Sequence, residues 1–270
     1  QPQIATAGGE KWMEIAFLNA LQRSPSMPPH DPWLSGFAIS YYYLGYLLLS
    51  MLTTVAGIPA TIAFTLGNAA WFALAAVAAY GIVYDLLDGR NPFGALLAPV
   101  LLLLTGNATG FLQIIHARGF LPAAFWRWLD IRGINSAPAT PGVLLTPDRF
   151  DWWRASRTLH DYAPISTADN PVSQEVIDEF PAFSFILGDM HPHLLALPFV
   201  LLAVALALHL WRRPAGVFQG WRDQNVAALP WIMRLRSWLP YAMVLGALGF
   251  LNTWDFPIYW ALTVGVLLLK

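Results

Sequence analysis

Long apolar stretches separated by short polar breaks dominate this sequence. Five of them are predicted to be membrane helices: residues 61–87, 93–117, 194–211, 238–251 and 258–270. A run of about twenty apolar residues is long enough to cross a bilayer. The pattern therefore predicts an all-α, polytopic membrane protein. Because the last stretch is still apolar where it ends, we expect the sequence to be an excerpt of a longer protein.

A sixth apolar stretch, residues 37–56, differs from the others because it begins with clustered tyrosines. Tyr41, Tyr42, Tyr43 and Tyr46 lie near its start. Tyrosine prefers the headgroup level of a bilayer. The stretch could cross the membrane, but its tyrosine-rich start favours a juxtamembrane or re-entrant helix.

Two polar regions remain, residues 1–36 and residues 118–193. The first contains a short amphipathic pattern over residues 11–21. The second is too long for a simple connection, and its aromatic and basic residues at 125–132 and 150–157 are typical of membrane-surface segments. We interpret both regions as loops of one membrane-embedded domain.

The arginines after residue 211 predict which face these loops occupy. Five arginines follow that span against a single acid, Asp223, and they are Arg212, Arg213, Arg222, Arg234 and Arg236. Such a segment is expected in the cytoplasm. Residues 118–193 then lie on the outer face, and residues 1–36 join them if residues 37–56 do not cross the membrane.

Composition supports the membrane assignment and narrows the chemistry. The chain is 57% hydrophobic and 11% charged, whereas a soluble domain carries roughly 25% charged residues. Its net charge of −1 argues against a nucleic-acid partner. The absence of cysteine excludes disulfides and thiolate metal ligands.

The most reactive segment lies just before the stretch at 194–211 and contains Asp189, His191 and His193. Pro192 disfavours helix at His191, so we expect an extended chain there. Residues two apart in an extended chain face the same side. These three side chains could then bind a divalent metal ion, bind a substrate, or form a hydrogen-bonded network that fixes the loop.

Three other polar groups are candidates for the same recess. Asn252 and Asp255 interrupt an apolar stretch, which indicates either a pocket or a locally capped helix break. Arg154 and Arg157 could bind a phosphate, although for each arginine alone the pattern favours anchoring at the membrane surface. Glu179 could pair with Arg154 or line the same recess.

Several blocks of the sequence resemble the "YYY" family of membrane proteins, named for its tyrosine triplet. The blocks are residues 10–21, 29–33, 41–43, 179–181, 188–193 and 252–257. That family is grouped with the GT-C superfamily of membrane glycosyltransferases. The resemblance implies a GT-C-like fold, a polyprenyl-phosphate sugar as donor, and helices of the first external loop that lie along or dip into the outer leaflet.

The resemblance also implies an acidic residue in the first external loop, which would be Glu10, with Glu14 as the alternative. Two features depart from the superfamily. The helix expected before that loop is missing, and the usual acidic pair is not reproduced as adjacent residues.

The sequence therefore predicts a multi-pass protein of a prokaryotic plasma membrane that transfers a sugar at the non-cytoplasmic face. The alternative is a non-catalytic transporter or lipid-binding membrane protein. Glu10, Glu14 and Asp189 are the predicted catalytic residues. The predicted substrate contacts are Lys11, Tyr42, Arg154, Arg157, Glu179, His191, His193, Asn252, Trp254 and Asp255.

Overall fold

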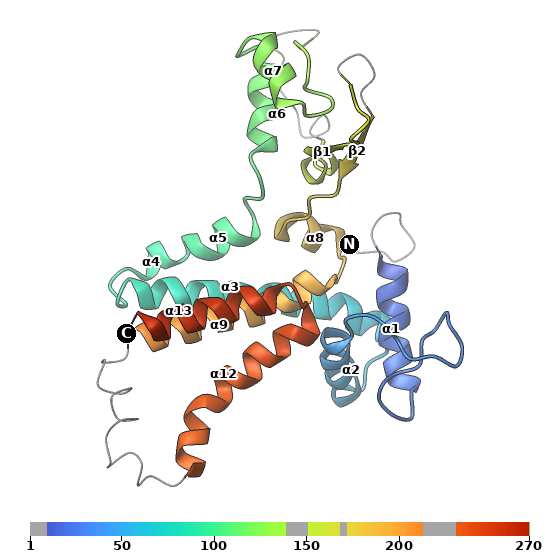
Figure 1. Cartoon of the computed structure of the whole chain (residues 1–270), viewed down its shortest axis with the longest axis vertical. Helices are drawn as coiled ribbons and strands as arrows, with labels where there is room; N and C mark the ends of the chain where they lie inside the picture. Colours follow the sequence, from blue (N-terminus) through green and yellow to red (C-terminus); the bar gives the residue numbers. More distant parts are fainter. Residues whose placement is uncertain (1–9, 139–150, 168–171, 213–230, 270) are drawn as a thin grey trace. The chain divides into compact units, whose positions relative to one another are not determined.

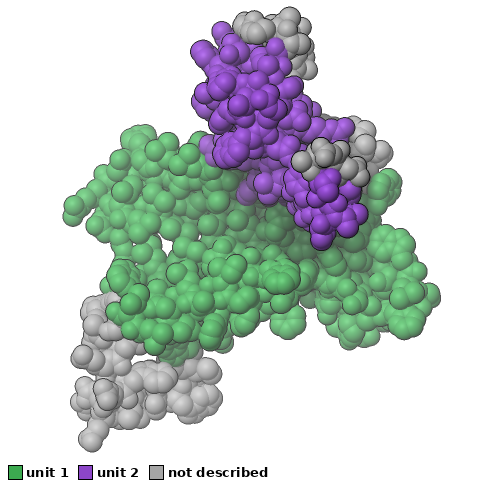
Figure 2. Space-filling view, turned by 45° about the horizontal axis from the view of Figure 1, so that its top comes forward, with its two compact units in different colours: residues 1–103, 185–270 green, residues 104–184 purple. Residues whose placement is uncertain are grey.

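The computed structural model describes residues 10–138, 151–167, 172–212 and 231–269. The chain is mostly helical and divides into two compact units (Figures 1 and 2). The first comprises residues 1–103 and 185–270, and the second comprises residues 104–184.

The first unit contains the apolar helices. They are α1 (Lys11–Arg23), α2 (Leu44–Ala56), α3 (Ala60–Leu86), α4 (Pro92–Ala95), α5 (Leu97–Leu103), α9 (Pro192–Arg212), α12 (Trp231–Leu251) and α13 (Asp255–Leu268). By length and composition, α3 and α9 could each cross a membrane. They coincide with the spans predicted at 61–87 and 194–211, and α1 confirms the short helix predicted at 11–21.

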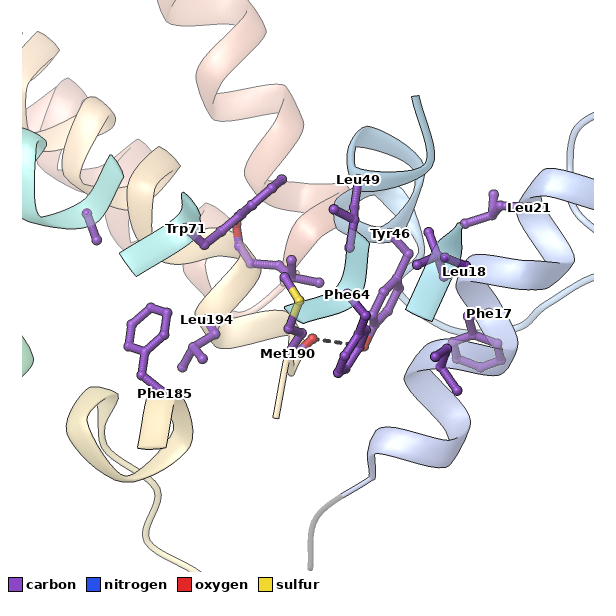
Figure 3. Packing of buried hydrophobic residues seen from close by; sticks show 14 of the residues in the cluster. Phe17, Leu18, Leu21, Tyr46, Leu49, Phe64, Trp71, Phe185, Met190 and Leu194 are labelled. Carbon is purple, nitrogen blue, oxygen red and sulfur yellow. Dashed lines mark hydrogen bonds between the residues drawn. The ribbon is translucent and has the colours of Figure 1, made fainter. Parts of the chain in front are cut away.

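Helix α9 is the centre of this unit and packs against α2, α3, α12 and α13. The packing with α2 is close because Gly45 lies against Leu195, and a Cβ added at Gly45 would come within 2.7 Å of the Leu195 Cβ. Small residues allow such close helix contacts. Figure 3 shows Leu194 from α9 beside Phe185, in the same buried cluster as core residues of α1, α2 and α3, among them Phe17, Leu49 and Phe64.

Two contacts show that α3 and α9 run in the same direction. The indole of Trp71, in the middle of α3, donates a hydrogen bond to the carbonyl of Leu195, in the first turn of α9, at 2.9 Å. At their far ends, Arg212 forms an ion pair with Asp88 at 3.0 Å. The 21 residues of α9 rise about 30 Å. The segment before Pro192 and the Asp88 turn therefore lie at opposite ends of the helix pair.

Helix α2 is too short to cross a bilayer alone. Its 13 residues rise about 20 Å, against a hydrocarbon core of about 30 Å. It ends at Gly57, which adopts a left-handed conformation with φ of 66°. A juxtamembrane or re-entrant position for residues 37–56 remains a prediction, and the helical part of that stretch begins only at Leu44.

The single helix predicted over residues 93–117 is wrong. The stretch is divided into α4, α5 and α6 (Thr109–Ala117). Gly106 adopts a φ of 57°, which a continuous helix does not allow, and the Asn107 side chain accepts a hydrogen bond from the Thr109 backbone N–H at 3.1 Å. These residues end one helix and start another, although the flanking sequence is apolar throughout.

The second unit contains α6, α7 (Ala123–Leu129), a 3-10 helix at Trp153–Ser156, and the antiparallel strands β1 (Leu159–Tyr162) and β2 (Ser173–Val176). Helix α8 (Pro181–Leu187) runs from this unit into the first. The small apolar core of the second unit includes Trp126, Ile131 and Ile134. The long polar region predicted as a loop thus has secondary structure of its own.

Candidate functional site

The candidate site lies in the first unit, where α1 meets the link between α8 and α9. Gly188 ends α8 with a φ of 73°, and α9 begins at Pro192. Proline suits the first position of a helix because that position needs no backbone N–H. Asp189, Met190 and His191 are therefore left as a short non-helical link.

Two carboxylates clamp this link to the start of α1. The Glu10 backbone N–H donates to both oxygens of Asp189, at 3.1 and 3.2 Å. In the opposite direction, the Met190 backbone N–H donates to Glu14 Oε2 at 2.9 Å. Asp189 thus satisfies a donor at the start of α1, where a negative charge is favoured by the helix dipole.

The His191 imidazole lies among three carboxylates. Its Nε2 is 3.2 Å from Glu10 Oε2, and its Nδ1 is 3.3 Å from Asp189 Oδ2 and 3.4 Å from Glu14 Oε1. Residues separated by more than 170 positions in the sequence therefore meet at one ring. The sequence predicted that Glu10, Glu14, Asp189 and His191 converge, and they do.

The three acids differ in their access to solvent. The side chains of Glu14 and Asp189 are completely buried, whereas the side chain of Glu10 is 54% exposed. The His191 side chain is 18% exposed. Only Glu10 among these acids can therefore contact a bound substrate directly, while Glu14 and Asp189 act on it through His191 and the backbone.

The two buried carboxyl groups share one proton at neutral pH. Burial, together with the negative charge of Asp189, raises the pKa of Glu14 from 4.5 to about 9. Burial also opposes ionisation of Asp189, but hydrogen bonds from His191, Glu14 and the Glu10 backbone outweigh it and lower the Asp189 pKa. Glu14 is therefore protonated when Asp189 is ionised.

Three side chains whose partners the sequence did not reveal hold this segment in place: Tyr46 and Trp71 are buried, and Asn68 is half-buried. Tyr46 donates from its hydroxyl to the Met190 carbonyl at 3.0 Å, as the dashed line in Figure 3 shows. Trp71 bonds the Leu195 carbonyl, and Asn68 donates to the Phe185 carbonyl at 3.1 Å. Each lies in an apolar stretch, where a single polar side chain gives no signal of its partner.

The tyrosine triplet lines an open cavity of about 640 Å³ in the same unit. Tyr41, Tyr42 and Tyr43 contribute to one side, and Thr253, between α12 and α13, contributes to another. Burial and the charges of Glu10 and Glu14 raise the pKa of Tyr41 to about 12. The wall of this cavity at Tyr41 is thus electrostatically coupled to the acidic cluster. The role of Tyr42 as a substrate contact remains a prediction.

His193 does not take the position expected of it. It lies in the first turn of α9, so the extended geometry predicted over residues 189–193 ends at Pro192. Among the described residues, the group that could hold a metal ion is Glu14, Asp189 and His191. Glu14 thus takes the position predicted for His193. Lys11 lies in the first turn of α1 and is buried.

The helix break between α12 and α13 is capped locally. Asn252 donates from its side chain to Asp255 Oδ2 at 3.1 Å, and the Asp255 backbone N–H donates to the Asn252 carbonyl at 3.0 Å. Trp254 is exposed. These contacts match the simpler of the two interpretations of the break, and the substrate-binding role of these residues remains a prediction.

Arg154, Arg157 and Glu179 belong to the second unit. Arg154 forms an ion pair with Glu175 at 2.5 Å, and Arg157 stacks over the Trp153 ring at 4.0 Å. Glu179 accepts a hydrogen bond from the Ser184 hydroxyl at 2.9 Å. These contacts stabilise the second unit, so phosphate binding by the arginines also remains a prediction.

Comparison with known proteins identifies a family for the chain. A family model described as uncharacterized membrane protein (DUF2298) matches residues 1–270, and the chain belongs to this family. No curated protein and no solved structure matches the chain. Together with the apolar helices α3 and α9, the family supports a membrane location.

Proposed function

We propose that this member of the DUF2298 membrane-protein family transfers a sugar from a polyprenyl-phosphate donor to a hydroxyl acceptor. The reaction takes place at the non-cytoplasmic face of a prokaryotic plasma membrane, in a multi-pass protein with a GT-C-like fold. The donor class comes from the resemblance of the sequence blocks to the tyrosine-triplet family. The catalytic group comes from the geometry of the acidic cluster.

One observation carries the proposal. The exposed Glu10 carboxylate contacts His191 Nε2 at 3.2 Å, and buried Glu14 and Asp189 flank the other ring nitrogen. A solvent-accessible carboxylate held by a buried hydrogen-bonded network is the arrangement expected of a general base. The structure therefore favours Glu10 over Glu14 as the acid that meets the acceptor.

In the proposed reaction the acceptor oxygen attacks the anomeric carbon of the sugar. The bond between that carbon and the lipid phosphate oxygen breaks, and the phosphate leaves with the electron pair. Glu10 takes the acceptor proton, and the anomeric configuration is inverted. His191 keeps the Glu10 carboxylate oriented, while Asp189 holds the backbone N–H of Glu10.

Transport is the alternative function, and it would favour acids along a continuous cavity through the membrane helices. The two cavities described for the first unit have no acidic residue in their linings. One is the tyrosine cavity. The other is almost entirely apolar and lies between α2, α3 and α9, with Trp71 and Phe199 among its lining residues.

The test is turnover of a polyprenyl-phosphate sugar by purified full-length protein in lipid nanodiscs. We expect Glu10→Gln and Asp189→Asn to abolish release of the polyprenyl phosphate. Asp88→Asn is the matched control, because Asp88 is an exposed carboxylate at the far end of α9, about 30 Å away. Unchanged turnover in Glu10→Gln would reject the assignment of the base.

A further inference from the structure

Three atoms of the acidic cluster that could serve as metal ligands lie close together. Glu14 Oε1 and Asp189 Oδ2 lie 3.4 and 3.3 Å from His191 Nδ1. All three ligand atoms lie within 4.8 Å of one another. The three residues come from two segments that backbone hydrogen bonds clamp together, so the arrangement is a property of the fold and not of one flexible loop.

The two separations that involve His191 Nδ1 match the spacing of ligands around a metal ion. With ion-to-ligand distances of about 2.1 Å, neighbouring ligands are roughly 3.0 Å apart at right angles and roughly 3.4 Å apart at the tetrahedral angle. The distances from Nδ1 to the two carboxylates fall in this range. An ion could therefore be bound with little movement of the side chains.

Each proposed ligand is also oriented by a group outside the site. A histidine that binds a metal through one nitrogen usually donates its other N–H to a carboxylate or carbonyl. His191 Nε2 faces the Glu10 carboxylate at 3.2 Å, so on metal binding the ring can keep the proton on Nε2 and release the one that Nδ1 otherwise directs at Asp189, which leaves Nδ1 as the ligand. The Met190 and Glu10 backbone N–H groups hold Glu14 and Asp189.

Glu14 provides an independent indication that a cation belongs here. Its Oε2 is satisfied by Met190, but its buried Oε1 accepts no hydrogen bond within the part of the chain that the structure describes. The side chain is completely buried. Placing a carboxylate oxygen in such a position is costly unless a proton or a metal ion binds it.

We propose that Glu14, Asp189 and His191 bind a divalent first-row transition-metal ion, with Glu10 as the outer partner that orients His191. Two carboxylates and one imidazole form a mixed oxygen and nitrogen set that suits Mn²⁺ and its neighbours in the series. This set differs from the one expected from sequence, because Glu14 replaces His193. The inference rests on the proposed function only in its consequence, since an ion here would fix His191 and, through it, the Glu10 carboxylate.

The experiment measures metal binding directly, with no sugar donor present. Full-length protein in nanodiscs is stripped with EDTA and titrated with MnCl₂, and free Mn²⁺ is followed by electron paramagnetic resonance. We expect one saturable ion per chain in the wild type. Glu14→Gln and Asp189→Asn should weaken binding at least tenfold, and Glu10→Gln by about tenfold, as is typical of an outer partner.

A control variant and a second measurement distinguish loss of the metal site from loss of folding. His209→Gln removes a histidine near the other end of α9 and should bind Mn²⁺ like the wild type. In the wild type, pulsed electron paramagnetic resonance should detect coupling of the bound Mn²⁺ to an imidazole nitrogen. The His191→Gln protein should lose that coupling. No saturable Mn²⁺ in the wild type, or equal affinity in Glu14→Gln, would overturn the metal site.

The outcomes also separate this inference from the proposed function. Saturable Mn²⁺ binding without sugar turnover would leave the metal site standing and reject the glycosyltransferase assignment. Sugar turnover in protein that binds no Mn²⁺ would do the reverse.

Discussion

Glu14→Gln in metal-free protein is the sharpest test of the electrostatics of the cluster. Glutamine keeps the size of the side chain and an oxygen that can accept the Met190 N–H, which lies 2.9 Å from Glu14. It removes the ionisable group whose pKa burial raises from 4.5 to about 9. The substitution should therefore change how stability depends on pH more than it changes the structure.

The sign and size follow from linkage. A folded pKa above the unfolded value means that the group's contribution to stability is complete below the unfolded pKa and is lost as pH rises to the folded one. For Glu14 this interval runs from 4.5 to about 9 and corresponds to roughly 6 kcal/mol at about 1.36 kcal/mol per unit.

Asp189 does not obscure this effect. Its pKa is lowered, so its contribution is present above the unfolded value of 3.8 and is lost only in more acidic solution. Between pH 5 and 8, wild-type stability should therefore fall as pH rises because of Glu14, and the Glu14→Gln protein should lose most of that slope.

The assay is thermal unfolding in EDTA at a series of pH values, at one lipid composition and one scan rate. Melting temperatures are compared as slopes against pH, because unfolding of a membrane protein is often irreversible. Equal slopes for wild type and Glu14→Gln, or a steeper slope for the variant, would show that Glu14 is ionised in the folded protein and would refute the shared proton.

Two further predictions concern the contacts that support the site, and thermal unfolding checks both. Tyr46→Phe removes the hydroxyl that bonds the buried Met190 carbonyl and should cost about 1–3 kcal/mol, whereas an unchanged melting temperature would show that the bond is unimportant. Gly45→Ala should cost about 1–3 kcal/mol because the new methyl group would lie 2.7 Å from Leu195. Its control, Gly81→Ala in α3, has no atom within 4 Å of the new methyl group and should be neutral or slightly stabilising.

The sequence predicted the long helices better than it predicted their interruptions. Helices α3 and α9 begin and end within a residue or two of the predicted spans, because hydrophobic length alone decides them. The span at 93–117 failed at Gly106 and Asn107, where a left-handed glycine and a side-chain cap outweigh the apolar pattern. Such a break depends on two residues among many apolar ones.

For the site, the sequence predicted the residues but not which of them are buried and which is exposed to solvent. The convergence of Glu10, Glu14, Asp189 and His191 followed from chain direction and from the family-like blocks. That Glu14 is buried and Glu10 exposed could not be predicted, because it depends on how α1 rotates against α2 and α3. His193 was assigned to the cluster because the start of α9 was placed two residues too late.

A purely structural explanation of the cluster accounts for Asp189 but not for Glu14. Asp189 accepts two hydrogen bonds at the start of α1, which is a sufficient reason for a buried carboxylate. Glu14 also bonds a backbone N–H, but a neutral glutamine would do so without the cost of a second acid beside Asp189. A second buried acid that must stay protonated beside Asp189, and so makes folding depend on pH, is unfavourable for stability alone. It is favourable if the cluster must accept a cation, and then the firm support from Tyr46 and Trp71 is needed to hold three acids around one imidazole before the ion binds.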